Sequence, residues 1–317
     1  MHPEMAAIRS RCFRFFAAFL ALCAAAAQAR AWDSTGHMLV GEIAYEQVRP
    51  DVRARVDALV RTLDNRYNNH KPYNFVTVGC YMDDTRAEKG YPYSSWHYMD
   101  VNYTPDGSGF VEPAAPNVVW ALQQSVATFE DAGSTGPQKA LAMAMLIHFT
   151  GDIHQPLHCV DWNDKGGNGY FIAGVPFSDL SKKKPANLHA FWDRAYRFGV
   201  QGGKVIELYY SPWPSERPNV PAVGVIRNQA ARIMERYPPA SMAELANVGD
   251  PHEWARESYR YACKFGYPHG KHPDDFEVVT LAPAFVSEAH DVACRRIALA
   301  GYRLANLLNS LFDTQEK

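Results

Sequence analysis

A single all-α domain is the fold class that the sequence predicts, and three observations support it. Apolar residues recur at intervals of three and four over several long segments, as on the buried face of a helix. Strand-like alternation is scarce, and residues 170–177 are the best candidate for a short β-hairpin. The Pro- and Gly-rich stretches 103–116 and 211–224 are interpreted as surface loops, because no repeat or low-complexity tract divides the chain.

The first expected helices have clear boundaries. Residues 38–64 have helical periodicity that is broken at Pro50, since proline cannot continue a helix that precedes it. Residues 117–133 begin at Asn117, a favourable N-cap, and end at Gly133. Both segments are therefore expected to be amphipathic helices of the same domain.

The third expected helix differs from the others in being apolar almost all round. Residues 137–155 have few polar positions on any face, which predicts a central buried helix. Residues 252–266 and 283–312 have the periodicity of two further helices. The expected architecture is thus mainly helical, with at most a short β-hairpin.

The first 31 residues have the pattern of a secretory signal peptide. Three arginines precede a nearly apolar run of about 13 residues (15–27), which is short of the roughly 20 needed to span a membrane. Ala-Arg-Ala at 29–31 then supplies a small-x-small cleavage pattern. We expect cleavage to leave one catalytic domain, 32–317, secreted or periplasmic and not stably bound to a membrane. An uncleaved anchor is the alternative.

Charge argues against an electrostatic nucleic-acid binder. The whole chain has a net charge of −2, and the signal contains four Arg and one Glu, so the mature chain has −5. A protein without basic excess cannot hold a nucleic-acid backbone by charge alone. If this protein acts on nucleic acid, phosphate must be bound by another device, such as a metal ion.

Cysteine usage predicts disulfide bonds. Two of the six cysteines leave with the signal, and an even remainder in an exported chain favours two disulfides. Three pairings are possible; Cys80–Cys159 and Cys263–Cys294 are favoured by their positions along the chain. Asn102 begins an Asn-x-Thr glycosylation sequon.

Histidines and aspartates recur at helical spacing, as metal ligands do. His148 and Asp152 are four residues apart in HFTGDIHQPLH, so they share one helix face, where burial is costly unless something pairs them. NLHAFWD repeats this spacing. The ligand types are those of zinc, and separate hydrogen-bonded clusters are the alternative. The remaining candidates in these segments are His158, His189, Asp193, His97, and either Asp83 or Asp84.

Cleavage before Trp32 would create a further ligand. A free α-amine has a pKa near 8, so a metal ion displaces its proton readily near neutral pH. The amine nitrogen and carbonyl oxygen of Trp32 can chelate one ion, and His37 would add an imidazole nearby. The chain contains no P-loop, dinucleotide fingerprint or Gly-x-Ser-x-Gly elbow.

The mature chain resembles the zinc-dependent type I nucleases, the mung bean nuclease-like family, within a superfamily shared with bacterial zinc phospholipases C. The matching motifs are WDSTGH, YMDDTR, WHYMD, HFTGDIHQPLH, GGN, NLHAFWD and WARES, which cover nearly its whole length. The resemblance implies three Zn²⁺ ions. Their implied ligands are Asp83, His97, His148 and Asp152 for one, Trp32, His37 and Asp152 for the second, and His158, His189 and Asp193 for the third.

One motif departs from the family pattern, which is usually Trp-Ala-Asp-x-x-Arg. This chain has Tyr-Met-Asp-Asp-Thr-Arg at 81–86. Counting back from Arg86 selects Asp83 as the ligand, with Asp84 as the alternative.

The resemblance also implies an activity. It predicts an endonuclease, monomeric, that hydrolyses single-stranded DNA and RNA to 5′-phosphate products, with 3′-nucleotidase activity as a further expectation. Asp152 would bridge two zincs, and Arg86 would neutralise charge on the phosphate oxygens. Tyr98 would stack on an unpaired base unless it is a core aromatic, and Asp100 would accept from an exocyclic amine.

Three readings of the sequence stay open. The Lys-rich stretch 181–185 is interpreted as a solvated loop, with contact to backbone phosphates as the alternative. A zinc phospholipase C and a non-enzymatic exported zinc-binding protein are the rival functions. Arg86 and the WHYMD and GGN segments favour the nuclease.

Overall fold

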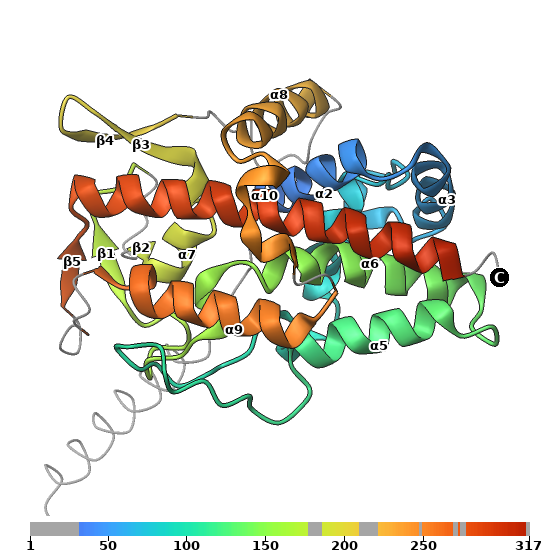
Figure 1. Ribbon diagram of the computed structural model, residues 1–317, viewed down its shortest axis with the longest axis horizontal. Coiled ribbons are helices and arrows are strands. Elements are labelled where there is room, and N and C mark those ends of the chain that lie inside the picture. Colours follow the sequence, from blue (N-terminus) through green and yellow to red (C-terminus); the bar gives the residue numbers. More distant parts are fainter. Residues whose placement is uncertain are drawn as a thin grey trace, which may run out of the picture.

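Helices make up most of the chain, as the sequence predicts, and the strands are confined to two small sheets (Figure 1). The computed structural model describes residues 32–176, 186–208, 221–246, 249–268, 272 and 277–314. The expected signal peptide and the Lys-rich stretch 181–185 lie outside the described residues. None of the helices in the described ranges is long and apolar enough to cross a membrane.

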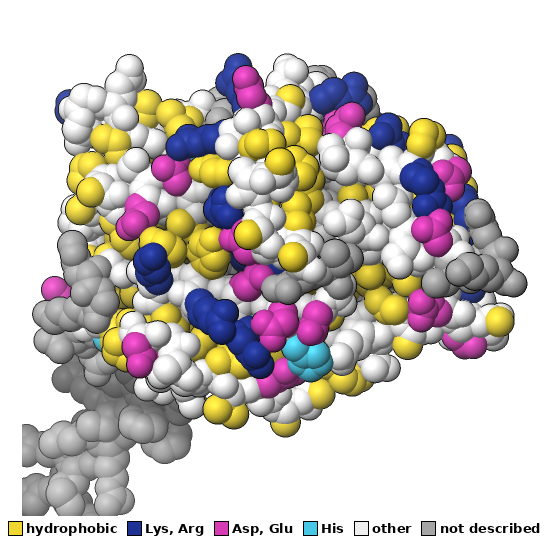
Figure 2. All heavy atoms as spheres, in the orientation of Figure 1, with side chains coloured by type: hydrophobic (Ala, Val, Ile, Leu, Met, Phe, Trp, Pro, Cys, Tyr) yellow, Lys and Arg dark blue, Asp and Glu magenta, His cyan; other side chains and the backbone are white. Residues whose placement is uncertain are grey.

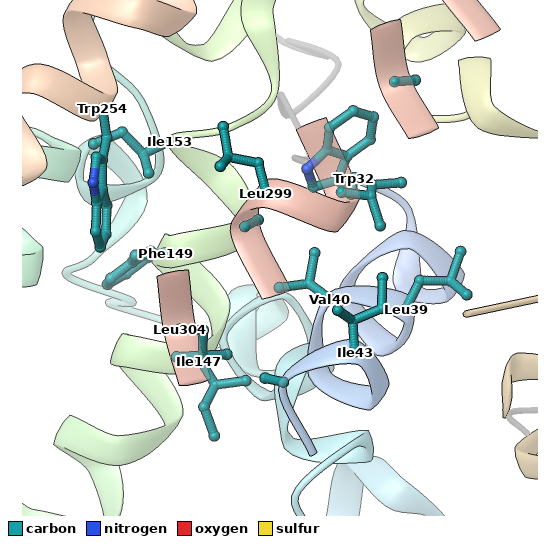
Figure 3. Packing of buried hydrophobic residues seen from close by; sticks show 14 of the residues in the cluster. Trp32, Leu39, Val40, Ile43, Ile147, Phe149, Ile153, Trp254, Leu299 and Leu304 are labelled. Atoms are coloured by element: carbon teal, nitrogen blue, oxygen red, sulfur yellow. The ribbon is translucent and has the colours of Figure 1, made fainter. Parts of the chain in front are cut away.

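The central helix is α6, Gly136–Asp152, as expected from its apolar sequence. Thr135 caps it by a reciprocal pair of hydrogen bonds with Gln138, and every residue from Ala142 to Asp152 is buried. α2 (Ser34–Gln47) and α10 (Pro283–Thr314) pack against it and against each other. Figure 3 shows the apolar side chains of these three helices meeting in one core.

Local signals explain the other predicted helices. α2 ends just before Pro50, the first residue of α3 (Pro50–Val60), so the expected break is confirmed. α5 spans Val118–Glu130, and the Asn117 side chain accepts from the backbone N–H of Trp120 at 3.0 Å. α5 packs along α6.

The segment expected as a helix over 252–266 contains two kinds of helix. α9 runs over Pro251–Tyr261 and continues as a π-helical segment, Ala262–Gly266. One further long helix, α8 (Pro221–Arg236), was not predicted, and its first residues fall in the stretch 211–224 interpreted as a loop. The short helices α4 (Tyr81–Asp84) and α7 (Leu188–Trp192) carry site residues.

The sheets correct one expectation. β1 (Phe171–Ala173) does not fold back within 170–177; it pairs antiparallel with β2 (Ala186–Asn187) and parallel with β5 (Val278–Thr280). The true hairpin joins β3 (Phe198–Gln201) to β4 (Lys204–Glu207). Its Gly-Gly turn has φ of 57° and 74°, values that favour glycine.

Neither predicted disulfide forms, so the pairings Cys80–Cys159 and Cys263–Cys294 are wrong for this structure, in which all four cysteines are buried and none is in a disulfide. Their sulfurs have separate local neighbours. Cys80 Sγ lies 3.4 Å from a carbonyl oxygen of α2, Cys159 Sγ lies 3.7 Å from a carbonyl just after α6, and Cys294 faces a histidine one turn earlier on α10. The Asn102 side chain is exposed, and its glycosylation stays a prediction.

Candidate metal centre

The C-terminal end of α6 carries the first part of the site. Nε2 of His148 lies 3.3 Å from Oδ2 of Asp152, one turn further along the helix. The same oxygen lies 2.9 Å from Nδ1 of His97, and Oδ1 lies 3.3 Å from Nε2 of His37 on α2. All four side chains are buried. Asp152 therefore lies among three imidazoles and faces them with both oxygens.

Hydrogen bonds determine which imidazole nitrogens face this centre. His148 Nδ1 lies 2.6 Å from the carbonyl oxygen of Gly79, which can only accept, so Nδ1 carries a proton and Nε2 is the nitrogen that faces Asp152. The Tyr91 hydroxyl donates to the carbonyl of Met82 at 2.9 Å and therefore accepts from Nε2 of His97 at 3.1 Å. Nδ1 of His97 is then unprotonated. It lies 3.1 Å from Nε2 of His148 and 2.9 Å from Oδ2 of Asp152, so its lone pair faces a carboxylate oxygen with no proton of its own to share.

A second pair of histidines has the same arrangement. His158 lies in the turn after α6 and donates from Nδ1 to the carbonyl oxygen of His97 at 2.6 Å. His189, on α7, donates from Nδ1 to the carbonyl oxygen of Gly166 at 2.6 Å. Their Nε2 atoms lie 3.2 Å apart, and Oδ1 of Asp193 lies 3.7 Å from Nε2 of His189. Here too, two imidazole Nε2 atoms face each other beside a buried carboxylate.

The first residues of α2 complete the centre. The His37 ring stacks on His148 with 3.9 Å between ring centroids, and neither of its nitrogens forms a hydrogen bond. The Trp32 indole donates to the carbonyl of Gly151 at 2.9 Å. Residue 151 must be glycine for this packing, because a Cβ there would lie 2.9 Å from Nδ1 of His37.

The neighbouring aspartates of α4 have different surroundings. Asp83 lies 3.3 Å from Arg86, and its carboxylate joins two of the histidines in a group of converging ligand atoms. The Asp84 carboxylate instead accepts from the Tyr73 hydroxyl at 2.8 Å and is in none of the metal-capable groups of the described chain. The geometry therefore favours Asp83 as the ligand.

All eight predicted side-chain ligands lie in groups whose ligand atoms are within 4.8 Å of one another. One group differs from the ligand sets that the resemblance implies. Asp83 is grouped with His37 and His148, although the resemblance assigns Asp83 and His37 to different ions. The groups are His37, Asp83 and His148; His97, His148 and Asp152; and His158, His189 and Asp193.

Burial shifts the pKa values of these side chains. Desolvation, helped by repulsion from His148, lowers the pKa of His37 and of His97 well below the ordinary value. For His148, desolvation is outweighed by attraction to Asp152, and its pKa is raised. Desolvation raises the pKa of Asp152 to about 6 and that of Asp193 well above its usual range. The protein alone thus holds Asp152 and Asp193 ionised only at a cost, which a bound cation would reduce.

The two predicted base-binding residues are adjacent to the centre in the chain. Tyr98 follows His97, is half-buried, and has its pKa raised by burial and then by Asp100. Asp100 has an exposed side chain, yet desolvation and then repulsion from two nearby aspartates raise its pKa to about 6. Neither side chain forms a hydrogen bond within the described part of the chain, so each retains its hydrogen-bonding capacity for a ligand.

Sequence reasoning missed the residues that orient the ligands. Gln155 donates to Oδ1 of Asp193 at 2.8 Å, while its own oxygen accepts from the backbone N–H of Leu157. Gln155 lies inside the HFTGDIHQPLH motif, so the motif contained this signal. The sequence contained no signal for the Gly79 carbonyl or the Tyr91 hydroxyl, because only the tertiary fold brings them within hydrogen-bond distance of His148 and His97.

This fold and this centre define a mainly helical protein with a buried, metal-capable cluster of His and Asp side chains. A family model described as S1/P1 Nuclease matches residues 32–313. The chain belongs to this family; it is a nuclease, and its substrate is a nucleic acid.

Several named nucleases are similar to this chain over nearly its whole length. Nuclease P1 of Penicillium citrinum is 22% identical over 90% of this chain and 99% of its own. Endonuclease 1 of Arabidopsis thaliana is 25% identical, over 93% of this chain and 91% of its own. Nuclease S1 of Aspergillus oryzae is 22% identical, over 88% and 91%. The similarity is therefore one of whole domains.

Proposed function

We propose that this protein is an exported, monomeric endonuclease that binds three Zn²⁺ ions, hydrolyses single-stranded DNA and RNA to 5′-phosphate products, and also acts on 3′-nucleotides. One observation carries the metal-dependent part. His148 and His97, and again His158 and His189, face each other with ring nitrogens 3.1 and 3.2 Å apart, each pair beside a buried carboxylate. A cation among these nitrogen and oxygen atoms would be coordinated by them.

The donor set fits zinc. Zinc in proteins takes imidazole nitrogen and carboxylate oxygen, and each metal-capable group supplies both. The backbone carbonyls of Gly79 and Gly166 and the hydroxyl of Tyr91 hold three of the imidazoles in the ligating tautomer, as is usual around metal ligands. When bound, zinc lowers the pKa of a coordinated water toward about 7 and polarises phosphate oxygens.

The protein's own groups then orient and neutralise the substrate. Asp152 faces the ligand histidines with both oxygens and fixes their positions relative to one another. The Arg86 guanidinium, held 3.3 Å from Asp83, is suited to neutralise charge on a phosphate oxygen. Tyr98 would stack on an unpaired base and Asp100 would accept from its exocyclic amine, which favours single strands.

The N-terminus of the mature chain is part of the proposal. Trp32 is buried, its indole is anchored to α6, and the next residue donates its backbone N–H to the Asp193 carbonyl at 3.0 Å. These contacts hold Trp32 between the C-terminal end of α6 and Asp193. Cleavage after residue 31 would give it a free amine, and that amine and the Trp32 carbonyl would chelate an ion with His37.

The first test combines metal analysis with activity. The protein purified from an exporting host should contain about three zinc ions per chain and release 5′-mononucleotides from denatured DNA. Exhaustive EDTA should abolish this activity and lower the melting temperature, since a metal saturated about 1,000-fold above its Kd contributes about 4 kcal/mol. Undiminished hydrolysis by zinc-free protein would contradict the metal-dependent mechanism.

A matched pair of proteins tests the N-terminal ligand. A chain that begins at Trp32 should bind more zinc and act faster than one that keeps a single residue before it. Equal zinc content and equal rates would exclude the chelate. Phosphatidylcholine as a substrate separates the phospholipase C alternative, which the family match already disfavours.

A further inference from the structure

Two hollows open on the surface where α9 passes into the π-helical segment and meets α10. They have volumes of about 440 and 590 Å³, within the range of ligand sites, and they share Lys264 and Phe265. Figure 2 shows hydrophobic side chains in the space between α9 and α10, with Lys and Arg side chains beside them. This α9–α10 groove is defined by Tyr237, Arg260, Tyr261, Lys264, Phe265 and Arg295.

Aromatic rings form much of the groove. Tyr261 and Phe265 lie one helical turn apart, with ring centroids separated by 5.7 Å, and Tyr237 contributes a third ring from the end of α8. All three side chains are only partly buried. Lys264 Nζ lies 4.8 Å from the ring centroid of Phe265, and Arg296 Cζ lies 4.9 Å from that of Tyr261, so a flat aromatic ligand would stack on the opposite face of either ring.

The charges around these rings are unequal. Arg295 is paired with Glu244 at 2.9 Å, and Asp291 is paired with Arg236 at 2.7 Å. Arg260 and Lys264 are exposed, one turn apart, and have no carboxylate partner within the described ranges. The second hollow also has the exposed Glu288 in its lining, so the groove presents these two cations beside one carboxylate, on a chain whose net charge is −2.

We propose that the α9–α10 groove binds a nucleotide of a single-stranded nucleic acid at a place separate from the metal centre. The base would stack on Phe265 or Tyr261, and the phosphate would lie at Arg260 and Lys264. Aromatic stacking combined with backbone contacts to cations is the usual chemistry of single-strand binding. The proposal rests on the proposed function, because a nuclease that acts on single strands supplies this ligand.

The contacts of Gly266, on the inner side of the π-helical segment, explain why the groove takes no part in the reaction. Gly266 ends the π-helical segment, and its carbonyl accepts from the Trp192 indole at 2.8 Å. A Cβ at Gly266 would lie 3.0 Å from the Leu157 side chain. Trp192 and Leu157 directly precede the candidate ligands Asp193 and His158 in the chain. The segment thus supports the metal centre on one side and forms the groove on the other, so the groove would add affinity for long strands and not chemistry.

Kinetics on short and long substrates test the groove. In the double variant Arg260→Ala/Lys264→Ala, we expect KM for a single-stranded 20-mer to rise about tenfold, because two phosphate contacts are lost. The slope of log KM against log salt should become shallower by about 1.4, at about 0.7 per contact. KM for a dinucleotide should change less than twofold, because the groove is proposed to bind a nucleotide beyond the two held at the metal centre.

Two further variants separate stacking from charge and from general surface effects. Phe265→Leu keeps an apolar side chain but removes the ring, and KM for the 20-mer should rise about fivefold, near the lower limit for a stacked base. Arg256→Ala is the matched control, because Arg256 lies one turn earlier on α9, is paired with Glu253 and does not line the groove. It should leave both values of KM unchanged.

A direct titration counts the sites. 5′-AMP should bind the wild-type protein at two sites and the Arg260→Ala/Lys264→Ala variant at one. Equal numbers of sites in both proteins, or an unchanged KM and salt slope, would overturn the groove proposal while leaving the nuclease proposal intact. A wild-type protein inactive on both substrates would overturn the proposed function, and the titration would still decide whether the groove binds a nucleotide.

Discussion

Two buried polar clusters lie at the C-terminal end of α6, and they differ in how their charges are compensated. The metal centre contains Asp152, the last residue of α6. The second cluster, here the arginine network, joins Glu257 of α9 to Arg296 and Arg303 of α10, together with His154 and Ser258. Both clusters are largely shielded from solvent.

The arginine network is nearly satisfied by its own members. Arg303 makes two 2.7 Å bonds to the two oxygens of Glu257, and Arg296 donates to the carbonyl of His154 at 3.1 Å. His154 donates to the Thr150 carbonyl at 2.7 Å and accepts from Arg303 at 3.0 Å. Of these side chains, only Arg303 has an atom without a partner, its Nε.

The metal centre is not satisfied in this way. Both nitrogens of His37 and one oxygen of Asp152 lack hydrogen bonds, and the ring nitrogens of His97 and His148 face each other at 3.1 Å. The difference shows that buried charge by itself does not indicate a functional site. Imidazole nitrogens and carboxylate oxygens that lack hydrogen bonds and converge on one point do indicate such a site, because burying them is costly unless a ligand binds them.

Asp152→Asn should have the largest effect on activity. The amide cannot supply a second anionic oxygen among three imidazoles, so we expect kcat/KM on denatured DNA to fall on the order of 10³-fold, the several kcal/mol that metal-ion catalysis supplies. The measurement is steady-state kinetics, with zinc per chain as a second readout. A variant that keeps full zinc and full activity would refute the central position of Asp152.

Glu257→Gln should lower the free energy of unfolding and leave the activity nearly unchanged. It leaves two buried guanidinium groups without an anion, and breaking a buried pair of this kind costs about 3–5 kcal/mol of stability. Urea unfolding should show this loss, while the folded variant keeps its zinc content and its KM for a dinucleotide. Loss of zinc at unchanged stability would show that the two clusters are one functional unit.

The adjacent aspartates of α4 give a smaller and sharper contrast. Asp83→Asn should lower kcat/KM about 10- to 100-fold, as changes around a metal site do, with little change in stability. Asp84→Ala removes the acceptor of the buried Tyr73 hydroxyl and should cost about 1–3 kcal/mol of stability with near-normal kinetics. If the two profiles were exchanged, the ligand would be Asp84.

The smallest effect concerns Asp100 and pH. Its pKa is raised to about 6, so the carboxylate that would accept from a base is ionised at pH 7 and mostly protonated at pH 5. KM for an adenine dinucleotide should rise about fivefold over this range, the worth of roughly 1 kcal/mol of hydrogen-bond strength. KM for a thymine dinucleotide, which has no exocyclic amine, is the internal control. A constant ratio of the two KM values would remove Asp100 from base recognition.

Sequence alone determined the helices whose signals are local. The capped start of α5, the break at Pro50 and the apolar surface of α6 follow from neighbouring residues, and all three are confirmed. The hairpin of β3 and β4 also had a local signal, Gly202-Gly203, which the sequence reasoning overlooked. The spacing of His148 and Asp152 likewise placed both on one helix face before any fold was known.

Only the tertiary structure decided the contacts between distant segments. β1 takes its partners from 186–187 and 278–280, and the four cysteines that spacing suggested as pairs point to separate local neighbours. His154 and His158 stand in one motif, yet His154 is held by Arg303 and His158 faces His189. The chemistry of an imidazole is the same at both positions. What it does depends on the groups that folding brings to it from elsewhere in the chain, and spacing along the sequence does not encode them.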